Sequence, residues 1–321
     1  MRGLLIATVT VALLAGVGFV SYSTLFQGDP PPEAPVFNDT PTRPLAQGDE
    51  FEKLAHNNAV AMFEQCLSRY TREVTGGFHA TLEKQERVKG KPPHPEMPPI
   101  EVIDLWVRGD VPDPMSHKTN IEVLMKWQSG AKSFLGYEIR GTLFSEKPKS
   151  EGGYDGRVVT WRPKAPFTKL SSPIDANNSL AQSQSRYCIR DAGLYRSMLR
   201  THEAWKIRQA AGELKTEYLG KQTPKQIGRE CYVVKRICPR MEIDAFEIGG
   251  TASTDPKVVA SEGFTEVTVY IDTQRWLQLG TELYRTEPDG TRVLVGSYYF
   301  RDVQLNPTIP PDTFAEEGLK K

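Results

Sequence analysis

The fold is decided by the stretch LGTELYRT (279–286), EPDG (287–290) and RVLVGSYYFRDVQL (292–305) near the C-terminus. The first and third pieces contain the β-branched and aromatic residues that favour strands. The middle piece has the proline, aspartate and glycine of a tight turn. Two strand-like runs joined by so short a turn predict an antiparallel hairpin.

Runs of the same kind recur through most of the chain, and they predict about ten antiparallel strands in all. Besides the hairpin, we expect strands at 70–74, 78–88, 101–110, 120–128, 134–146, 156–162, 216–220, 226–237 and 267–272. Glycine pairs and proline-containing turns separate them. The spacing favours one long meander rather than parallel strands joined by helices.

Two helices interrupt this series. Apolar residues at helical spacing predict a first helix at 50–69, with Asp49 as its N-cap, and a second at 191–210. A β-sandwich normally has shorter strands and no internal helix. We therefore expect a mainly β protein with helices (α+β). Its single strongly curved antiparallel sheet, an unclosed half-barrel, wraps one or two helices, with the 191–210 helix on the concave side.

The N-terminus has the features of an export segment. No charged residue occurs from Gly3 to Gly28, Arg2 precedes this run, and Asp29 follows it. This order places the amino end in the cytoplasm, and about 20 apolar residues span the ~30 Å membrane core. Residues 1–26 are therefore a signal peptide or a membrane anchor. Because the small-residue cleavage motif is poor, we expect a retained single-pass anchor.

The chain then divides into further parts. Residues 27–48 contain six prolines, Pro30, Pro31, Pro32, Pro35, Pro41 and Pro44, which predict a semi-rigid linker. The globular domain follows at 49–316, with a short tail at 317–321. This order is typical of a protein tethered on the periplasmic side of the inner membrane of a bacterial cell envelope, or else exported to the periplasm.

The charge balance and the cysteines narrow the function classes. Lys and Arg total 40, as do Asp and Glu, so no basic face is expected and nucleic acid is not a predicted partner. The four cysteines are Cys66, Cys188, Cys231 and Cys238, which an exported chain can pair or leave as small buried side chains. The sequence leaves these alternatives open. It contains no cysteine–histidine spacing of a zinc site.

Sequence motifs for catalysis are absent. The chain has no GxSxG, HExxH, Walker or GxGxxG pattern, and its histidines are scattered. Of these, His202 and Glu203 are adjacent on the expected second helix, and a solvated face is the preferred interpretation. We expect no enzyme, no catalytic residue, no metal and no cofactor.

Aromatic and aliphatic side chains on the strands give the only candidate binding surface. Within 120–128 and 134–146, alternate apolar residues share one face, and adjacent strands must point such faces the same way. A curved sheet that its helices do not fill leaves a cavity for a ligand; full coverage makes the same residues ordinary core. The predicted ligand-lining residues are Trp106, Ile121, Val123, Met125, Trp127, Tyr137, Ile139, Leu143, Leu194, Met198 and Trp205.

Three stretches carry a family resemblance: Ser185–Leu194 (SRYCIRDAGL), Gly228–Tyr232 (GRECY), and a C-terminal series of Val269–Asp272, Trp276-Leu277, Ser297–Asn306 and Asp312–Phe314. Together they resemble the family called domain of unknown function 1571, which is related to exported lipoprotein-carrier (LolA/LolB-like) proteins. The resemblance implies an unclosed barrel with an apolar cavity for acyl chains. It supplies no activity, and Arg190 replaces the threonine of the signature.

Two functions follow as expectations. The first is an envelope protein that binds an acyl chain, a lipid or a lipoprotein in the half-barrel cavity, so that its partners are a lipid or an acylated protein and, through residues 1–26, the membrane. The alternative is an anchored protein–protein interaction module whose core is filled by its own side chains. The oligomeric state is not predicted.

Overall fold

The computed structural model describes residues 48–87, 99–113, 119–131, 133–134, 136–166, 169–178, 185–243 and 256–320 of the 321-residue chain. The expected segment 1–26 and, apart from Gly48, the expected linker 27–48 lie outside the described residues. Among the helices described, none combines the length and the apolar character needed to cross a membrane.

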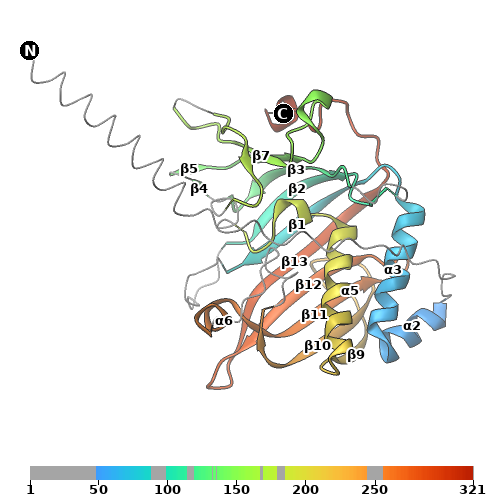
Figure 1. The fold of residues 1–321 in the computed structure, drawn as a ribbon. Helices are drawn as coiled ribbons and strands as arrows, with labels where there is room; N and C mark the ends of the chain where they lie inside the picture. The colour runs from blue at the N-terminus through green and yellow to red at the C-terminus, as the bar shows by residue number, and fades with distance from the viewer. Residues whose placement is uncertain are drawn as a thin grey trace, which may run out of the picture. The chain divides into compact units, whose positions relative to one another are not determined.

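One antiparallel sheet of 11 strands forms the body of the described part (Figure 1). From edge to edge its order is β8 (Ile174–Asp175), β7 (Arg157–Trp161), β6 (Gly141–Ser145), β3 (Glu122–Ser129), β2 (Glu101–Arg108), β1 (Phe78–Glu86), β13 (Arg292–Leu305), β12 (Gln278–Thr286), β11 (Phe264–Asp272), β10 (Cys231–Glu242) and β9 (Lys215–Gln222). The edge strands β8 and β9 are not hydrogen-bonded to each other within the described ranges. The barrel is therefore unclosed, as predicted.

The pairing of β1 with β13 joins the two halves of the sheet, with Phe78 opposite Leu305 at one end of the pair. The predicted hairpin is present as β12 and β13, in which Thr286 lies opposite Arg292. Outside the large sheet, β4 (Ser133–Phe134) and β5 (Tyr137–Glu138) form a two-stranded ribbon.

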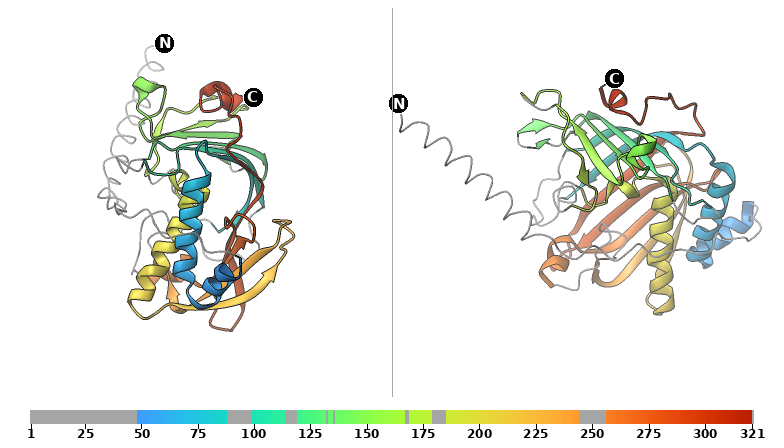
Figure 2. Two further views of the ribbon diagram at one scale, coloured as in Figure 1. Left: turned by 90° about the vertical axis from the view of Figure 1, so that its right-hand side faces the viewer. Right: turned by 45° about the horizontal axis from the view of Figure 1, so that its top comes forward.

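The sheet curves around two long helices, α3 (Ala59–Glu73) and α5 (Leu194–Ala210), which lie on its concave side (Figure 2). Phe63 of α3 meets Trp205 of α5 edge to face, with ring centroids 5.4 Å apart. Side chains of both helices and of the concave face belong to one apolar core. The predicted position of the second helix is confirmed.

Shorter helices complete the fold. They are α2 (Gly48–Asn57), α6 (Pro256–Glu262), α7 (Glu316–Lys320) and the 3₁₀ turns η1 (Lys149–Glu151) and η2 (Ile189–Asp191). Helix α6 lies between the strands expected at 226–237 and 267–272. Residues 317–321 were expected to be a tail, but α7 covers most of them and its Leu319 is fully buried.

The first helix was expected at 50–69, but the helical region begins at Gly48, ends at Glu73 and is interrupted near its middle. It divides into α2 and α3, because the Asn58 side chain accepts a hydrogen bond from the Ala61 N–H (3.0 Å) and caps a new helix. The expected strand 70–74 is wrong: α3 continues to Glu73. Tyr70, 1% exposed, follows Cys66 by one helical turn on the buried stripe of α3.

The expected strand 134–146 is also wrong as a single element. Gly136 adopts the left-handed backbone conformation (φ 79°) and ends β4, so that the chain turns into β5 and then β6. Three short strands, β4, β5 and β6, replace one long strand there.

A second apolar cluster lies on the other face of the sheet. It consists of Leu124, Leu143, Val159, Phe314 and Leu319. The C-terminal helix α7 packs on β3 and β6 at this place. Consequently this end of the sheet is apolar on both faces.

Candidate functional site

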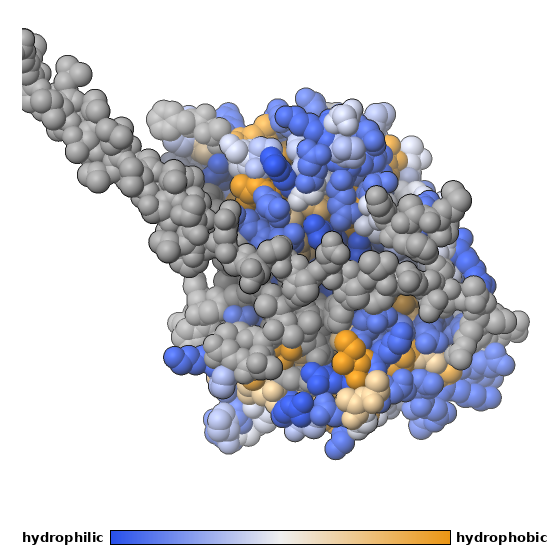
Figure 3. Space-filling model, viewed as in Figure 1, coloured by the Kyte–Doolittle hydropathy of each residue, from blue (hydrophilic) through white to orange (hydrophobic). Residues whose placement is uncertain are grey.

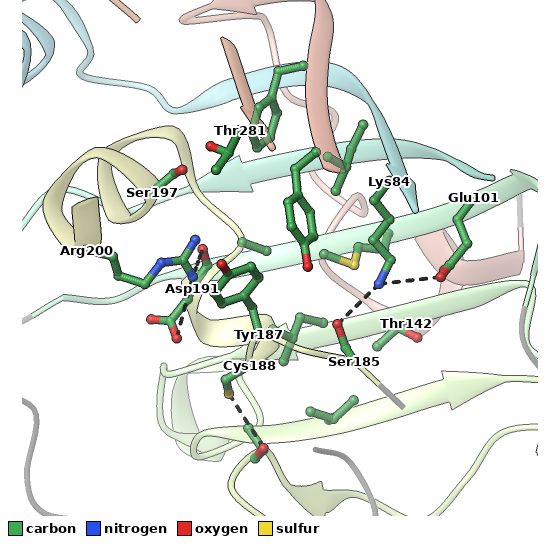
Figure 4. A pocket seen from close by; sticks show the side chains of 18 of the residues that line it. Lys84, Glu101, Thr142, Ser185, Tyr187, Cys188, Asp191, Ser197, Arg200 and Thr281 are labelled. Carbon is green, nitrogen blue, oxygen red and sulfur yellow. Dashed lines mark hydrogen bonds and ion pairs between the residues drawn. The ribbon is translucent and has the colours of Figure 1, made fainter. Parts of the chain in front are cut away.

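A cavity of about 240 Å³ lies between the concave face of the sheet, the helix α5 and the segment 185–192 (Figure 4). Most of its wall is apolar. The apolar wall includes Leu82, Met125, Trp127, Ile139, Val158, Ile174, Tyr187, Ile189, Val267, Leu283, Tyr298 and Phe300. Because an engineered apolar cavity of about 150 Å³ binds benzene, this one has room for a larger apolar group.

Strand alternation explains which side chains enter the cavity. Leu82 and Lys84 are two residues apart on β1 and therefore point to the same face. Lys84 lies opposite Glu101 of β2 on one side and opposite Tyr298 of β13 on the other. The three side chains form a row across the sheet on the cavity wall.

The helix beside the cavity is preceded by a glycine. Gly193 precedes α5, and a β-carbon there would lie 2.9 Å from Oδ2 of Asp110, so only glycine leaves room for this carboxyl. Asp110 Oδ2 accepts hydrogen bonds from the Tyr70 hydroxyl (2.9 Å) and the Tyr195 N–H (3.4 Å). Asp110 thereby joins the end of β2 to both long helices.

A buried polar cluster interrupts the apolar wall. The Nζ atom of Lys84 donates to Glu86 Oε1 (2.9 Å) and Ser185 Oγ (3.2 Å), and it lies 3.7 Å from Glu101 Oε1. Glu86 also accepts from the hydroxyls of Ser185 (2.9 Å) and Tyr298 (2.6 Å). The Glu86 side chain is completely buried, and those of Lys84 and Glu101 are nearly so.

The charges in this cluster are fixed by their partners. Burial alone would lower the pKa of Lys84, but the Glu86 and Glu101 carboxylates outweigh it and raise that pKa above its ordinary value. Burial, together with Glu86, raises the pKa of Tyr298 well above its ordinary value. Lys84 is therefore an ammonium group at neutral pH, and it cannot act as a base or a nucleophile.

A second charged pair lines the cavity beside α5. Arg200 Nη1 donates to the backbone oxygen of Asp191 (3.3 Å) and lies 3.9 Å from its Oδ2. The guanidinium group also lies over the Tyr187 ring, 4.2 Å from its centroid. These contacts hold Arg200 against the segment 185–192 (Figure 4).

Of the predicted ligand-lining residues, the structure brings three together at the cavity: Met125, Trp127 and Ile139. The Trp127 Nε1–H donates to Glu101 Oε2 (2.7 Å), which ties this ring to the polar cluster. Five others lie in the core between sheet and helices, outside the cavity wall: Ile121, Val123, Leu194, Met198 and Trp205. Binding by any of these residues stays a prediction.

The remaining three lie elsewhere. Leu143 faces the opposite side of the sheet, because it pairs with Leu124 in the outer cluster while Thr142 pairs with Met125. Trp106 also packs against the outer cluster and stacks on His79, with ring centroids 4.1 Å apart. Tyr137 belongs to the β4–β5 ribbon. Leu143 and Trp106 were predicted to line the ligand cavity, but both lie on the face of the sheet away from it.

His202 was expected to face solvent, and that expectation is wrong too. Its side chain is 8% exposed, Nδ1 lies 2.9 Å from Glu203 Oε1, and Nε2 lies 3.8 Å from Glu64 Oε1 of α3. The ring is part of the contact between α5 and α3 rather than of the cavity.

Two sequence patterns could have identified the cavity residues that the prediction missed. The alternation of Leu82, Lys84 and Glu86 placed two charged residues on the same face as an apolar one. The signature SRYCIRDAGL supplies Ser185, Tyr187, Cys188, Ile189, Asp191 and Ala192 to the cavity wall. These residues were used above only as evidence of the family resemblance, and in the structure they form one side of the site.

All four cysteines are described and all are free thiols. Cys188 lines the cavity and donates weakly to the Ala176 carbonyl (3.6 Å). Burial raises the pKa of the Cys188 thiol to about 11, so it is not a thiolate at neutral pH. Within the described residues there is no cluster of three His, Cys, Asp or Glu side chains placed to hold a metal ion.

Apolar side chains on the outer surface are scattered. On the face seen in Figure 3, the described residues form a mainly hydrophilic surface with small separate apolar patches. The large apolar side chains exposed among the described residues are Ile100, Ile207, Leu219 and Ile237. Scattered residues of this kind are normal on a protein surface, so the cavity is the better candidate site.

Solved structures similar to this one share little sequence with it. A putative outer membrane lipoprotein-sorting protein domain from Vibrio parahaemolyticus is 13% identical, with a TM-score of 0.34 over 82% of this chain and 100% of that chain. The Pseudomonas aeruginosa MucA/MucB complex is 10% identical, with a TM-score of 0.39 over 81% of this chain and 62% of that chain. The LolA superfamily protein NE2245 from Nitrosomonas europaea is 10% identical, with a TM-score of 0.28 over 79% of this chain and 98% of that chain. At these TM-scores the similarities identify neither a ligand nor a partner.

A search of curated proteins finds no sequence that matches this chain. The match to a protein family is extensive and confirms the resemblance seen in the sequence. It runs over residues 75–318, from just before β1 into α7, and thus includes the whole sheet and α5. The chain belongs to the family described as Protein of unknown function (DUF1571).

Proposed function

We propose that this protein binds one apolar chain, from a lipid or an acylated protein, in the cavity between the sheet and α5, without converting it chemically. One observation carries the proposal: a mainly apolar cavity of about 240 Å³ that strands from both halves of the sheet line together with α5. A core filled by its own side chains would leave only voids close to the size of a water molecule.

The size of the cavity sets the strength of binding. A group the size of a water molecule occupies about 30 Å³ in a liquid, so the cavity holds about eight methylene-sized groups, which is most of a ten-carbon chain. At about 0.8 kcal/mol per buried methylene, such a chain gains roughly 6 kcal/mol before ordering costs. That corresponds to a dissociation constant in the range of tens of micromolar or weaker. Binding is then reversible, as a carrier or a receptor for lipids requires.

The N-terminal sequence supports a place in the cell envelope. The uncharged run Gly3–Gly28 after Arg2 is long enough to span a membrane and is followed by a proline-rich linker. We propose that the anchor is retained and holds the cavity domain on the periplasmic side of the inner membrane. A mature N-terminus between residues 20 and 30, found by mass spectrometry of the membrane fraction, would show that the segment is a cleaved signal peptide and not a retained anchor.

Mass spectrometry of the purified full chain tests the binding proposal. We expect lipid or acyl-chain material to be released from the denatured protein. The matched control is Leu82→Trp, which places a larger side chain at the cavity wall without changing the charge. Equal release from both proteins, or from neither, contradicts the proposal. Release from neither leaves the interaction module, with no lipid ligand, as the alternative function.

A further inference from the structure

We infer that the Nζ atom of Lys84 donates a hydrogen bond to the carbonyl oxygen of a bound acyl chain, so that the cavity recognises esters and amides of fatty acids. This inference rests on the proposed function and names its ligand class. Two observations carry it: the number of hydrogen-bond acceptors around Lys84, and the position of Lys84 beside the apolar part of the cavity wall.

The ammonium group of Lys84 has one more N–H bond than the described residues accept. An ammonium group has three N–H bonds. Among the described residues, two acceptors lie within hydrogen-bond distance of Nζ, namely Glu86 Oε1 at 2.9 Å and Ser185 Oγ at 3.2 Å. Glu101 Oε1 lies 3.7 Å away, which is close enough for an ion pair and too far for a hydrogen bond. One N–H bond of Lys84 is therefore left for a ligand.

The Glu101 carboxylate is oriented by a residue of the next strand. Its Oε2 atom accepts a hydrogen bond from Trp127 Nε1–H of β3 (2.7 Å), while Oε1 faces Lys84. All three side chains line the cavity, and Figure 4 shows the Lys84 nitrogen between Ser185 and Glu101. The hydrogen bond to Trp127 draws the carboxylate toward β3, and the gap of 3.7 Å to Nζ remains.

Burial makes an unused donor on Lys84 costly. The Lys84 side chain is 9% exposed, so bulk water reaches little of it. A buried donor without an acceptor loses the hydrogen bond that water gives it in the unfolded chain. A ligand oxygen that accepts from this N–H restores that bond, and the protein gains affinity for ligands that carry one.

The apolar wall begins one row of side chains away from Lys84. Leu82 precedes Lys84 by two residues on β1 and therefore points to the same face, about 7 Å along the strand. On the neighbouring β13, Tyr298 lies opposite Lys84 and Phe300 lies opposite Leu82, and all four side chains line the cavity. An oxygen held at Lys84 is thus followed directly by a wall that suits methylene groups.

A carbonyl oxygen is the acceptor that matches this arrangement. It accepts a hydrogen bond and brings no proton that needs an acceptor of its own, whereas an alcohol brings one. In an acyl ester or amide, the carbonyl carbon is bonded directly to the apolar chain. A hydrocarbon chain without an oxygen would leave the Lys84 donor unused.

Infrared spectroscopy of methyl octanoate bound to the full chain at pH 7 tests the inference. The eight-carbon acyl chain suits the cavity volume, and the ester carbonyl band is separate from the amide bands of the protein. With protein in excess, we expect this band at a lower frequency than in hexane, because a hydrogen bond from an ammonium group weakens the C=O bond. An unshifted band overturns the inference and leaves the proposed function in place. Absence of binding, measured by calorimetry, overturns both.

The triple variant Lys84→Met, Glu86→Gln, Glu101→Gln shows whether Lys84 is the donor. It removes the ammonium group together with the two carboxylates that face it. In a variant that melts cooperatively, we expect the low-frequency band to disappear and the affinity for methyl octanoate to fall about tenfold. Lys215→Met, at an exposed position on β9, is the control and should keep both the band and the affinity. A low-frequency band that persists in the triple variant, or an unchanged affinity, overturns the inference.

Discussion

The Nζ atom of Lys84 lies 3.7 Å from Oε1 of Glu101, the residue directly opposite it in the register of β1 and β2. With Glu86, these side chains form a charged cluster on the wall of a cavity that is otherwise mainly apolar. A buried cation between two carboxylates is costly to separate, because each group depends on the others for its solvation. The cluster therefore links the stability of the sheet to the polar part of the cavity wall.

The first prediction concerns this dependence. Lys84→Met removes the ammonium group that faces the buried carboxylates of Glu86 and Glu101, and it should lower the free energy of unfolding by about 3–5 kcal/mol. The triple variant Lys84→Met, Glu86→Gln, Glu101→Gln should recover most of that loss. Urea denaturation measures both. Lys215→Met, at an exposed position on the edge strand β9, is the control and should change stability by less than about 0.5 kcal/mol. A Lys84→Met protein as stable as this control would show that the cluster does not stabilise the fold.

The second prediction concerns pH. Burial raises the pKa of Asp110 to about 6, although hydrogen bonds from Tyr70 and Tyr195 oppose this. The folded state then binds the Asp110 proton more tightly than the unfolded state does. The resulting stabilisation is present at low pH and is lost as the pH rises from about 4 through 6.

Asp110→Asn should remove this pH dependence. Relative to the unmodified chain, the variant should gain roughly 2–3 kcal/mol between pH 4 and pH 7, whatever its stability at pH 4. Denaturation curves at several pH values measure the difference. Glu83→Gln, on the outer face of β1, should show no such trend. A constant difference between Asp110→Asn and the unmodified chain would contradict the assignment.

The third prediction separates cavity wall from core. Trp205 is fully buried between the two helices, whereas Trp127 is half-buried on the cavity wall. Trp205→Ala should cost about 3–5 kcal/mol, because it opens a new void in packed core. Trp127→Ala should cost less and weaken 1-decanol binding several-fold. Thermal denaturation and calorimetry together measure the two effects. A larger loss of stability for Trp127→Ala, without a loss of binding, would assign Trp127 to ordinary core.

The fourth prediction concerns the outer apolar cluster. Leu319 of α7 is fully buried against Gly141, whose added β-carbon would lie 2.9 Å from Leu319 Cδ2. Leu319→Ala should cost about 2–4 kcal/mol. It should leave 1-decanol affinity unchanged, because the cluster lies on the face of the sheet away from the cavity. An altered affinity would show that the two faces are coupled.

Much of the fold follows from the sequence because alternation and turn residues are local signals. The hairpin of β12 and β13, the strands on either side of it and the helix α5 were all predicted within a few residues. The strand expected at 70–74 failed for a tertiary reason. Tyr70 is held at the end of α3 by a hydrogen bond to Asp110, 40 residues away in the chain.

The site was less predictable because it depends on register and on both faces of the sheet. Leu143 follows an apolar pattern that suits either face, and its register opposite Leu124 places it outward, where Phe314 and Leu319 cover it. Lys84 and Glu101 are 17 positions apart, and their approach depends on the pairing of β1 with β2. The fold therefore brings Lys84 and Glu101 together with Ser185 of the SRYCIRDAGL stretch, and no single motif contains all three.

Side-by-side calorimetric titration of 1-decanol into the full chain and into Leu82→Trp tests whether the cavity holds an apolar chain. We expect saturable one-to-one binding to the unmodified chain and at least tenfold weaker binding to the variant, with both proteins melting cooperatively. Equal binding to both proteins, or no binding to the unmodified chain, would contradict the claim that the cavity under the sheet holds an apolar chain.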